Sequence, residues 1–134
     1  FTLNTQSSSL SLQQFQGKII YLDFWASWCG PCKQSFPWLN QMQSKYAQHG
    51  LQVIAINLDA KINDAYQFLQ QHETQFIVAF DSEGKTPKNY GIKGMPSSVL
   101  ISREGKVLAQ HAGFRDSDKA MLEAHIQTAL GLKK

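Results

Sequence analysis

Residues 19–33 have the sequence IIYLDFWASWCGPCK, and this stretch decides the fold. Its first seven residues are almost entirely apolar and rich in aromatic and β-branched side chains. Such a run is typical of a strand that is buried on both faces of a parallel sheet. A helix is expected at the two cysteines that follow, so this stretch predicts a strand, a turn and a helix in direct succession.

Cys29 and Cys32 are separated by two residues, which is close enough for a small disulfide ring on a first helical turn. Cys29 would lie at the helix N-terminus, where free backbone N–H groups and the helix dipole favour an anion. This position lowers the pKa of the thiol and supplies a thiolate near neutral pH. Pro31 suits the first turn, because its φ is fixed and it donates no N–H. We predict that Cys29 attacks a partner disulfide and that Cys32 resolves the mixed disulfide.

Asp23 is unusual because it is a carboxylate in the middle of an apolar strand. Burial there should raise its pKa, since desolvation disfavours the charged form. The strand leads into the cysteine turn, so Asp23 can lie beneath the cysteine pair and take a proton from Cys32 when that thiol attacks. The alternative is an edge position at which Asp23 meets solvent.

Gly94-Met95-Pro96-Ser97 is the third notable element. A proline just before a strand can be cis, and the backbone of Met95 would then offer an edge for pairing with an extended substrate. The alternative is an ordinary strand-entry proline.

The rest of the chain predicts an α/β protein with a mixed central β-sheet flanked by helices. Residues 1–17 are expected to form short edge strands or a loosely docked arm. Further strands are expected at 51–58, 76–80, 97–102 and 106–111, with a polar loop around Pro87. Asp64 and Asp116 are expected to cap two helices. The helix after the cysteines should bury positions spaced by three and four residues, namely Phe36, Leu39, Met42 and Tyr46.

Composition excludes several other classes of protein. The chain has 134 residues, of which 43% are hydrophobic and 17% charged, which suits one globular domain. No apolar run approaches the roughly 20 residues of a membrane span. The net charge of +3 is scattered, so no nucleic-acid partner is expected. Two cysteines are too few for a disulfide scaffold or a four-thiolate zinc site, and the four histidines are dispersed, so no metal is expected.

The sequence resembles thioredoxin from about residue 18 to its end. The similarity lies in the motif YLDFWASWCGPCK, in Pro37, and in the later YGIKGMP. It implies the thioredoxin fold, a cis Pro96, and a substrate groove formed by Trp28, Gly30, Pro31, Met95 and Pro96. The segment of residues 60–85 is longer than the corresponding part of thioredoxin and is expected to add a helix and a strand. This insertion and the N-terminal extension of residues 1–17 resemble those of the TlpA/ResA-like envelope thioredoxins. We expect both to belong to a single domain that spans residues 1–134.

Two residues depart from the patterns of these families. TlpA/ResA-like proteins usually carry a glutamate just after the cysteines, where this chain has Ser35. Thioredoxin places a lysine beside its buried aspartate, and the corresponding residue here is Ala55. The acid–base group therefore resembles that of thioredoxin, without the cationic neighbour.

We therefore expect an exported thiol–disulfide oxidoreductase that reduces protein disulfides and is recharged by an upstream thiol donor. The resemblance implies a location in the periplasm or cell envelope, with the cytoplasm as the alternative. We expect a monomer, with no cofactor besides the Cys29–Cys32 disulfide. One rival is a peroxiredoxin-like peroxidase, but the Thr-x-x-Cys arrangement of that class is missing. Another is a copper-delivery module, which would be expected to have loops rich in Met and His.

Overall fold

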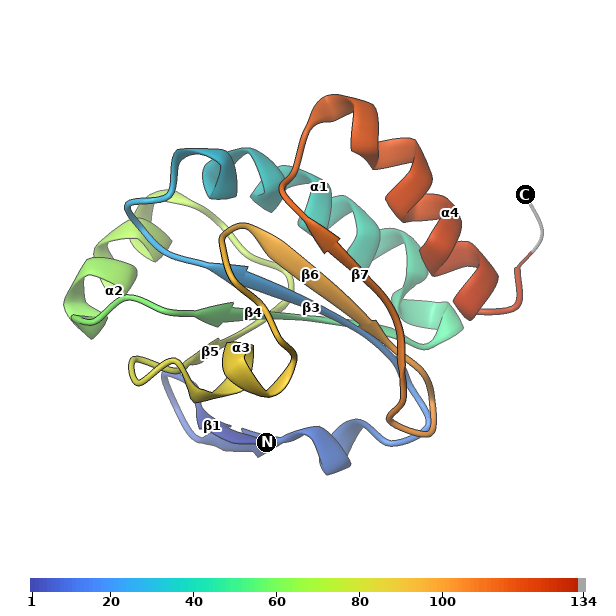
Figure 1. Ribbon diagram of the computed structural model, residues 1–134, viewed down its shortest axis with the longest axis horizontal. Helices are drawn as coiled ribbons and strands as arrows, with labels where there is room; N and C mark the ends of the chain where they lie inside the picture. The colour runs from blue at the N-terminus through green and yellow to red at the C-terminus, as the bar shows by residue number, and fades with distance from the viewer. Residues whose placement is uncertain (133–134) are drawn as a thin grey trace.

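The computed structural model describes residues 1–132 and places seven strands of that range in one sheet (Figure 1). The strand order is β2-β1-β5-β4-β3-β6-β7. β3, β4 and β5 are parallel to one another, whereas β6 is antiparallel to β3, and β7 to β6. The expected mixed sheet is thus confirmed. The strands are β1 (Thr2–Asn4), β2 (Ser9–Ser11), β3 (Ile19–Trp25), β4 (Leu51–Asn57), β5 (Ile77–Phe80), β6 (Ser97–Ile101) and β7 (Val107–Ala112).

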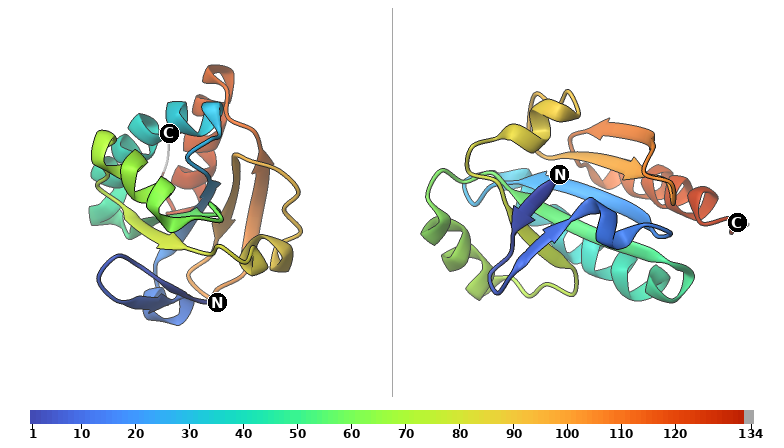
Figure 2. Two further views of the ribbon diagram at one scale, coloured as in Figure 1. Left: turned by 90° about the vertical axis from the view of Figure 1, so that its left-hand side faces the viewer. Right: turned by 90° about the horizontal axis from the view of Figure 1, so that it is seen from below.

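Three helices cover one face of the sheet, and the N-terminal segment together with Tyr90 and Ile92 covers the other. Buried side chains of α1, α2 and α4 form one apolar cluster with alternate residues of β3. The remaining residues of β3 pack against Phe1, Leu3 and Phe15. Figure 2 shows the N-terminal hairpin on the side of the sheet away from α1 and α4. The helices are α1 (Gly30–Tyr46), α2 (Ile62–Gln71), α3 (Lys85–Asn89) and α4 (Lys119–Ala129), with short 3-10 turns η1 (Leu12–Phe15), η2 (Ala47–His49) and η3 (Asp116–Asp118).

Strand β3 is the centre of the fold. All seven of its residues are buried, as the apolar run predicts. It pairs with β4 over its whole length and with β6 from Ile20 to Phe24. Because both edges and both faces of β3 are covered, the end of this strand is a fixed point from which α1 starts.

Residues 60–85 contain a helix and a strand, α2 and β5, as expected. The polar loop expected around Pro87 is wrong, because that proline lies within α3. The buried carboxylate of Asp81 accepts hydrogen bonds from the backbone N–H groups of Gly84 (3.1 Å) and Thr86 (2.7 Å) and thereby holds the start of this helix. Pro87 is tolerated there, because residues in a first helical turn have no intrahelical acceptor for their N–H.

Both expected helix caps are also displaced. α2 begins at Ile62, so Asp64 lies within its first turn and does not cap it. Asp116 begins η3, and α4 starts only at Lys119. At that end the side chain of Asp118 accepts a hydrogen bond from the backbone of Arg115, so the local turn replaces the simple cap that the sequence favours.

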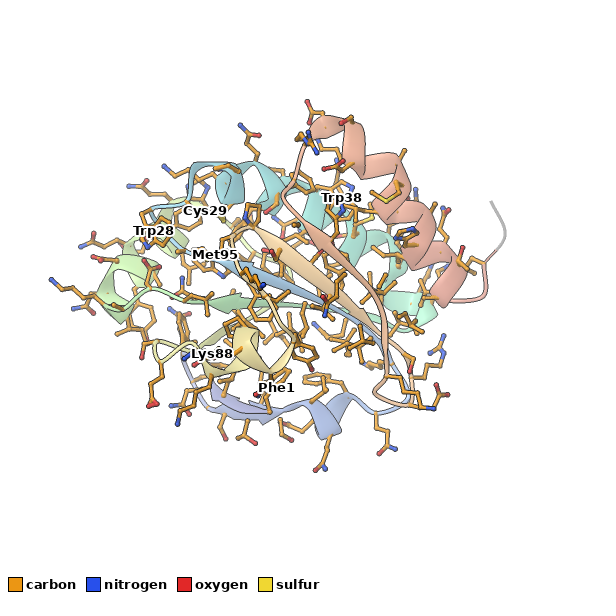
Figure 3. The ribbon with its side chains drawn as sticks, viewed as in Figure 1. Phe1, Trp28, Cys29, Trp38, Lys88 and Met95 are labelled. Atoms are coloured by element: carbon orange, nitrogen blue, oxygen red, sulfur yellow. A yellow bond between two sulfur atoms is a disulfide. The ribbon has the colours of Figure 1, made fainter. Side chains whose placement is uncertain are left out.

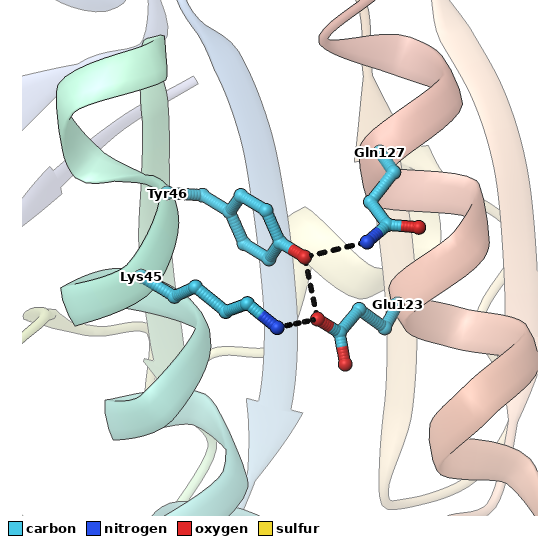
Figure 4. A network of polar contacts seen from close by, with 4 residues as sticks. All are labelled: Lys45, Tyr46, Glu123 and Gln127. Atoms are coloured by element: carbon cyan, nitrogen blue, oxygen red, sulfur yellow. Dashed lines mark hydrogen bonds and ion pairs between the residues drawn. The ribbon is translucent and has the colours of Figure 1, made fainter. Parts of the chain in front are cut away.

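A polar network joins α1 to α4 (Figure 4). Lys45 and Tyr46 of α1 both donate to one carboxylate oxygen of Glu123, and the amide of Gln127 donates to the Tyr46 hydroxyl oxygen at 2.8 Å. The hydrogen bond from Lys45, followed by that from Tyr46, lowers the pKa of Glu123. This network fixes the end of α1 that is remote from the cysteines.

Removing the Phe68 ring should show that α2 belongs to the main core. This ring lies 4.9 Å from that of Trp25 and 5.2 Å from that of Phe36, between centroids. We expect Phe68→Ala to lower the free energy of unfolding by about 3–5 kcal/mol, because it leaves a cavity beside two buried aromatics. The control is Gln67→Ala, at an exposed position of the same helix. Equal denaturant midpoints for the two variants would contradict this prediction.

Candidate active site

The two cysteines lie where β3 ends and α1 begins. Cys29 is the N-cap residue of α1 and Cys32 lies in its first turn. The two are joined by a disulfide, with 5.4 Å between their Cα atoms. Cys29 is 5% exposed and Cys32 is fully buried. A partner sulfur can therefore reach Cys29 and cannot reach Cys32 without a structural change.

The start of α1 favours a negative charge at Cys29. The first turn carries no acidic side chain, and Pro31 stands within it. Backbone N–H groups in a first helical turn have no intrahelical partner and stabilise a nearby anion. The structure thus gives Cys29 the surroundings that the sequence predicted for a reactive thiolate.

Ser35 occupies the position at which the family resemblance suggests a glutamate. Its hydroxyl is buried and donates to the backbone carbonyl of Cys32 at 2.8 Å. This hydroxyl is neutral at physiological pH. The titratable group for the site must therefore come from another element.

Asp23 lies on β3 and is 4% exposed, so the solvent-exposed edge position considered for it is wrong. In the sheet register its neighbours are Ala55 of β4 and Ser98 of β6. Among residues 1–132, its Oδ2 atom has no hydrogen-bond partner. Burial raises the pKa of Asp23 from 3.8 to about 8. The absence of a lysine at position 55 leaves this shift without a compensating charge.

Asp23 is on the face of the sheet that α1 covers. Side chains alternate along a strand, so Asp23 shares its face with Tyr21 and Trp25, which belong to the same apolar cluster as Cys29 and Cys32. Burial is the main cause that raises the pKa of the Tyr21 phenol, and the nearby Asp23 carboxyl raises it further. The carboxyl of Asp23 therefore lies on the face of the sheet that carries this cluster.

The expected groove residues are at the same edge of the sheet. The Met95-Pro96 peptide bond is cis, as the resemblance implies. Pro96 directly precedes β6, whose Ser97 pairs with Phe24 near the end of β3. Trp28 is 72% exposed, and Figure 3 shows it beside Cys29 in the segment that joins β3 to α1, with Met95 close to them in that view. Gly30 and Pro31 complete the surface around Cys29, and both are exposed.

Sequence reasoning missed Asp59, which follows β4. Its buried carboxylate accepts two hydrogen bonds from Ser27, one from the backbone N–H and one from the hydroxyl. The available signal was an acidic residue directly at the end of a buried strand. Its partner lies 32 residues away in the sequence, so no local pattern could identify the contact.

Metal-binding and membrane-spanning features are absent from the described part of the chain. Within residues 1–132, no group of three or more His, Cys, Asp or Glu side chains is arranged to hold a metal ion. Over the same range, no helix is both long enough and apolar enough to cross a membrane.

Comparison with known proteins confirms the resemblance to thioredoxin. The fold and the cysteine site define a thiol–disulfide oxidoreductase of the TlpA/ResA-like kind. The model of the Redoxin family matches residues 1–126. The chain therefore belongs to the Redoxin family.

Individual relatives agree with this assignment. The thiol-disulfide oxidoreductase ResA of Bacillus thuringiensis subsp. konkukian (strain 97-27) is 33% identical over 122 residues, which is 91% of this chain and 69% of the relative. A Chlorobium tepidum structure, assigned as the thiol:disulfide interchange protein DsbE, is 58% identical with a TM-score of 0.96, covering 98% of this chain and 93% of that one. The exposed lipoprotein thioredoxin of Streptococcus pneumoniae strain TIGR4 is 25% identical with a TM-score of 0.81, covering 94% and 98%.

Replacing Asp23 should change how stability depends on pH. A raised pKa in the folded state means that only the unfolded wild type releases the proton between about pH 4 and pH 8, so wild-type stability falls across that window. A tenfold change in proton affinity corresponds to about 1.4 kcal/mol. We expect the free energy of unfolding of Asp23→Asn to exceed that of the wild type by an amount that grows by several kcal/mol as the pH rises through this window.

Denaturant midpoints at acidic and alkaline pH measure this effect. The control is Asp116→Asn, the same substitution at a side chain that is 95% exposed. Parallel curves for wild type and Asp23→Asn would show that Asp23 is ionised at ordinary pH in the folded protein.

Proposed function

We propose that the protein reduces disulfide bonds in exported proteins, with Cys29 as nucleophile and Cys32 as resolving thiol. The observation that carries this order is the difference in access, because Cys29 reaches the surface at the N-cap of α1 and Cys32 does not. The reduced Cys29 thiolate attacks one sulfur of the partner disulfide, forms a mixed disulfide and releases one partner thiolate. Cys32 then attacks the sulfur of Cys29, which closes the internal disulfide and releases the second partner thiolate. Two electrons pass to the partner in this sequence.

Asp23 supplies the proton transfer that the second step requires. Cys32 is buried, and burial favours the neutral thiol, so its attack needs a nearby base. A carboxyl whose pKa is about 8 exchanges protons readily in the range where thiols do. Its place on β3 beneath the start of α1 supports transfer directly or through one water.

The surface around Cys29 would bind an extended segment of the substrate protein. Exposed Trp28 offers an apolar platform, and Gly30 and Pro31 add no bulky side chain beside the reactive sulfur. The backbone of Met95, next to Pro96, is available for strand-like pairing with the segment that carries the substrate disulfide.

The proposal extends to where the protein acts and in what form. The relative from Streptococcus pneumoniae is an exposed lipoprotein, which supports a site of action in the periplasm or cell envelope. The chain would act as a monomer and a single domain spanning 1–134, with residues 1–17 as an extension and residues 60–85 as an insertion. An upstream thiol donor would reduce the Cys29–Cys32 pair after each turnover, and no bound cofactor takes part.

Single cysteine variants test the order of attack. We expect Cys29→Ser to abolish the reduction of insulin disulfides, because no accessible nucleophile remains. Cys32→Ser should instead accumulate mixed disulfides with substrate, detectable by non-reducing electrophoresis and mass spectrometry. Accumulation of mixed disulfides in Cys29→Ser would reverse the two roles. Hydrogen peroxide turnover without insulin reduction would favour the peroxidase, and tight copper(I) binding without it would favour the metal module.

Asp23→Asn tests the proton transfer. The first attack by Cys29 should keep its wild-type rate, since Asp23 does not contact the partner. Release of the mixed disulfide should slow by about a hundredfold, as expected on losing a general base. Rapid-mixing tryptophan fluorescence separates the two steps. A variant with wild-type release would mean that another group takes the proton of Cys32.

A further inference from the structure

The carboxylate of Asp59 is the best-satisfied buried acid near the cysteines. It is 3% exposed and accepts three hydrogen bonds. Its Oδ2 atom accepts from the backbone N–H of Ser27 at 2.9 Å and from the side-chain amide of Asn57 at 2.7 Å. Its Oδ1 atom accepts from the Ser27 hydroxyl at 2.8 Å. Two of these bonds go to the turn that carries the reactive cysteine.

Asp59 is itself held firmly at the end of β4. Its backbone N–H donates to the side-chain oxygen of Asn57 at 3.0 Å, and Asn57 is almost fully buried. The backbone N–H of Leu58 donates to the carbonyl of Trp25 at 2.9 Å. The end of β4 therefore holds the segment after β3 at two places, the Trp25 carbonyl and the Ser27 peptide.

The segment between these points and α1 is short. Only Trp28 separates Ser27 from Cys29, and the backbone N–H of Cys29 donates to the carbonyl of Ala26 at 3.1 Å. Trp28 itself projects into solvent, so its side chain does not restrain the turn. Fixing Ser27 thus limits where the sulfur of Cys29 can lie relative to the N-terminus of α1.

We propose that Asp59 is a positioning residue, which through Ser27 keeps Cys29 at the N-terminus of α1 after the disulfide has opened. The proposal rests on the nucleophilic role of Cys29 given above. In the oxidised protein the bond to Cys32 also restrains Cys29, whereas in the reduced protein that restraint is lost. The contact between Asp59 and Ser27 involves no sulfur, so opening the disulfide breaks none of its hydrogen bonds. It thereby maintains the stabilisation of the thiolate that the attack requires.

Ser27→Ala is the substitution that tests the contact. It removes the bond from the hydroxyl to Oδ1 of Asp59 and changes no charge. Asp59→Asn is less informative, because loss of a negative charge would by itself lower the pKa of a neighbouring thiol. Ser27→Thr keeps the hydroxyl and serves as the rescue. Ser102→Ala is the matched control, because it removes a buried serine hydroxyl that accepts backbone hydrogen bonds in the distant turn between β6 and β7.

The measurement is the rate of alkylation of Cys29 in the reduced full chain as a function of pH, with the labelled residue identified by mass spectrometry. In Ser27→Ala the pH midpoint should rise, and the rate at about pH 6 should fall about two- to five-fold, the loss expected when a charge leaves a helix terminus. Ser27→Thr and Ser102→Ala should keep the wild-type profile. Denaturant midpoints of each variant establish that the fold is intact.

The alkylation results distinguish the positioning role of Asp59 from the nucleophilic role of Cys29. The positioning role of Asp59 would be overturned if Ser27→Ala kept the wild-type pH profile of alkylation. It would also be overturned if Ser27→Thr changed that profile as much as Ser27→Ala does. An ordinary thiol midpoint in the wild type, or labelling of Cys32 first, would instead contradict the proposed nucleophile. A lowered wild-type midpoint that Ser27→Ala raises and Ser27→Thr restores would support both.

Discussion

The complete burial of β3 is the constraint on which the rest of the structure depends. Seven consecutive residues of this strand are covered by helices on one face and by the N-terminal segment on the other. A strand so enclosed cannot slip in register without exposing its apolar side chains. Its end therefore fixes the start of α1 and the position of Cys29. The same enclosure places the carboxyl of Asp23 where water cannot solvate its charge.

Two buried acids near the cysteines have opposite surroundings and, in this account, different roles. Asp59 receives three hydrogen bonds, so its carboxylate is stabilised without solvent and can hold the turn that carries Cys29. Asp23 has no donor for its Oδ2 among residues 1–132 and lies beside Ala55 and Ser98. Its charged form is costly, which suits a group that exchanges a proton. The number of hydrogen-bond donors around each carboxyl group therefore distinguishes the positioning residue Asp59 from the proton-transfer residue Asp23.

The sequence predicted the features that depend on local pattern and on strong burial. The apolar run at residues 19–25 specified β3, and a single carboxylate inside it was enough to predict a raised pKa for Asp23. Helix starts were predicted less well, because a polar residue such as Asp64 can cap a helix or occupy its first turn, and tertiary packing decides between them. The contact of Asp59 with Ser27 was not predictable, since it depends on the juxtaposition of two strand ends in the sheet.

The most direct test of this account is the ionisation of Asp23 itself. The side-chain carboxyl carbon of aspartate responds to protonation in a ¹³C NMR titration, and Asp23→Asn identifies which resonance belongs to Asp23. In the oxidised protein we predict a midpoint at about pH 8, because burial without a compensating cation disfavours the charge. A midpoint near the ordinary value of 3.8 would contradict the account, since Asp23 would then be a solvated carboxylate.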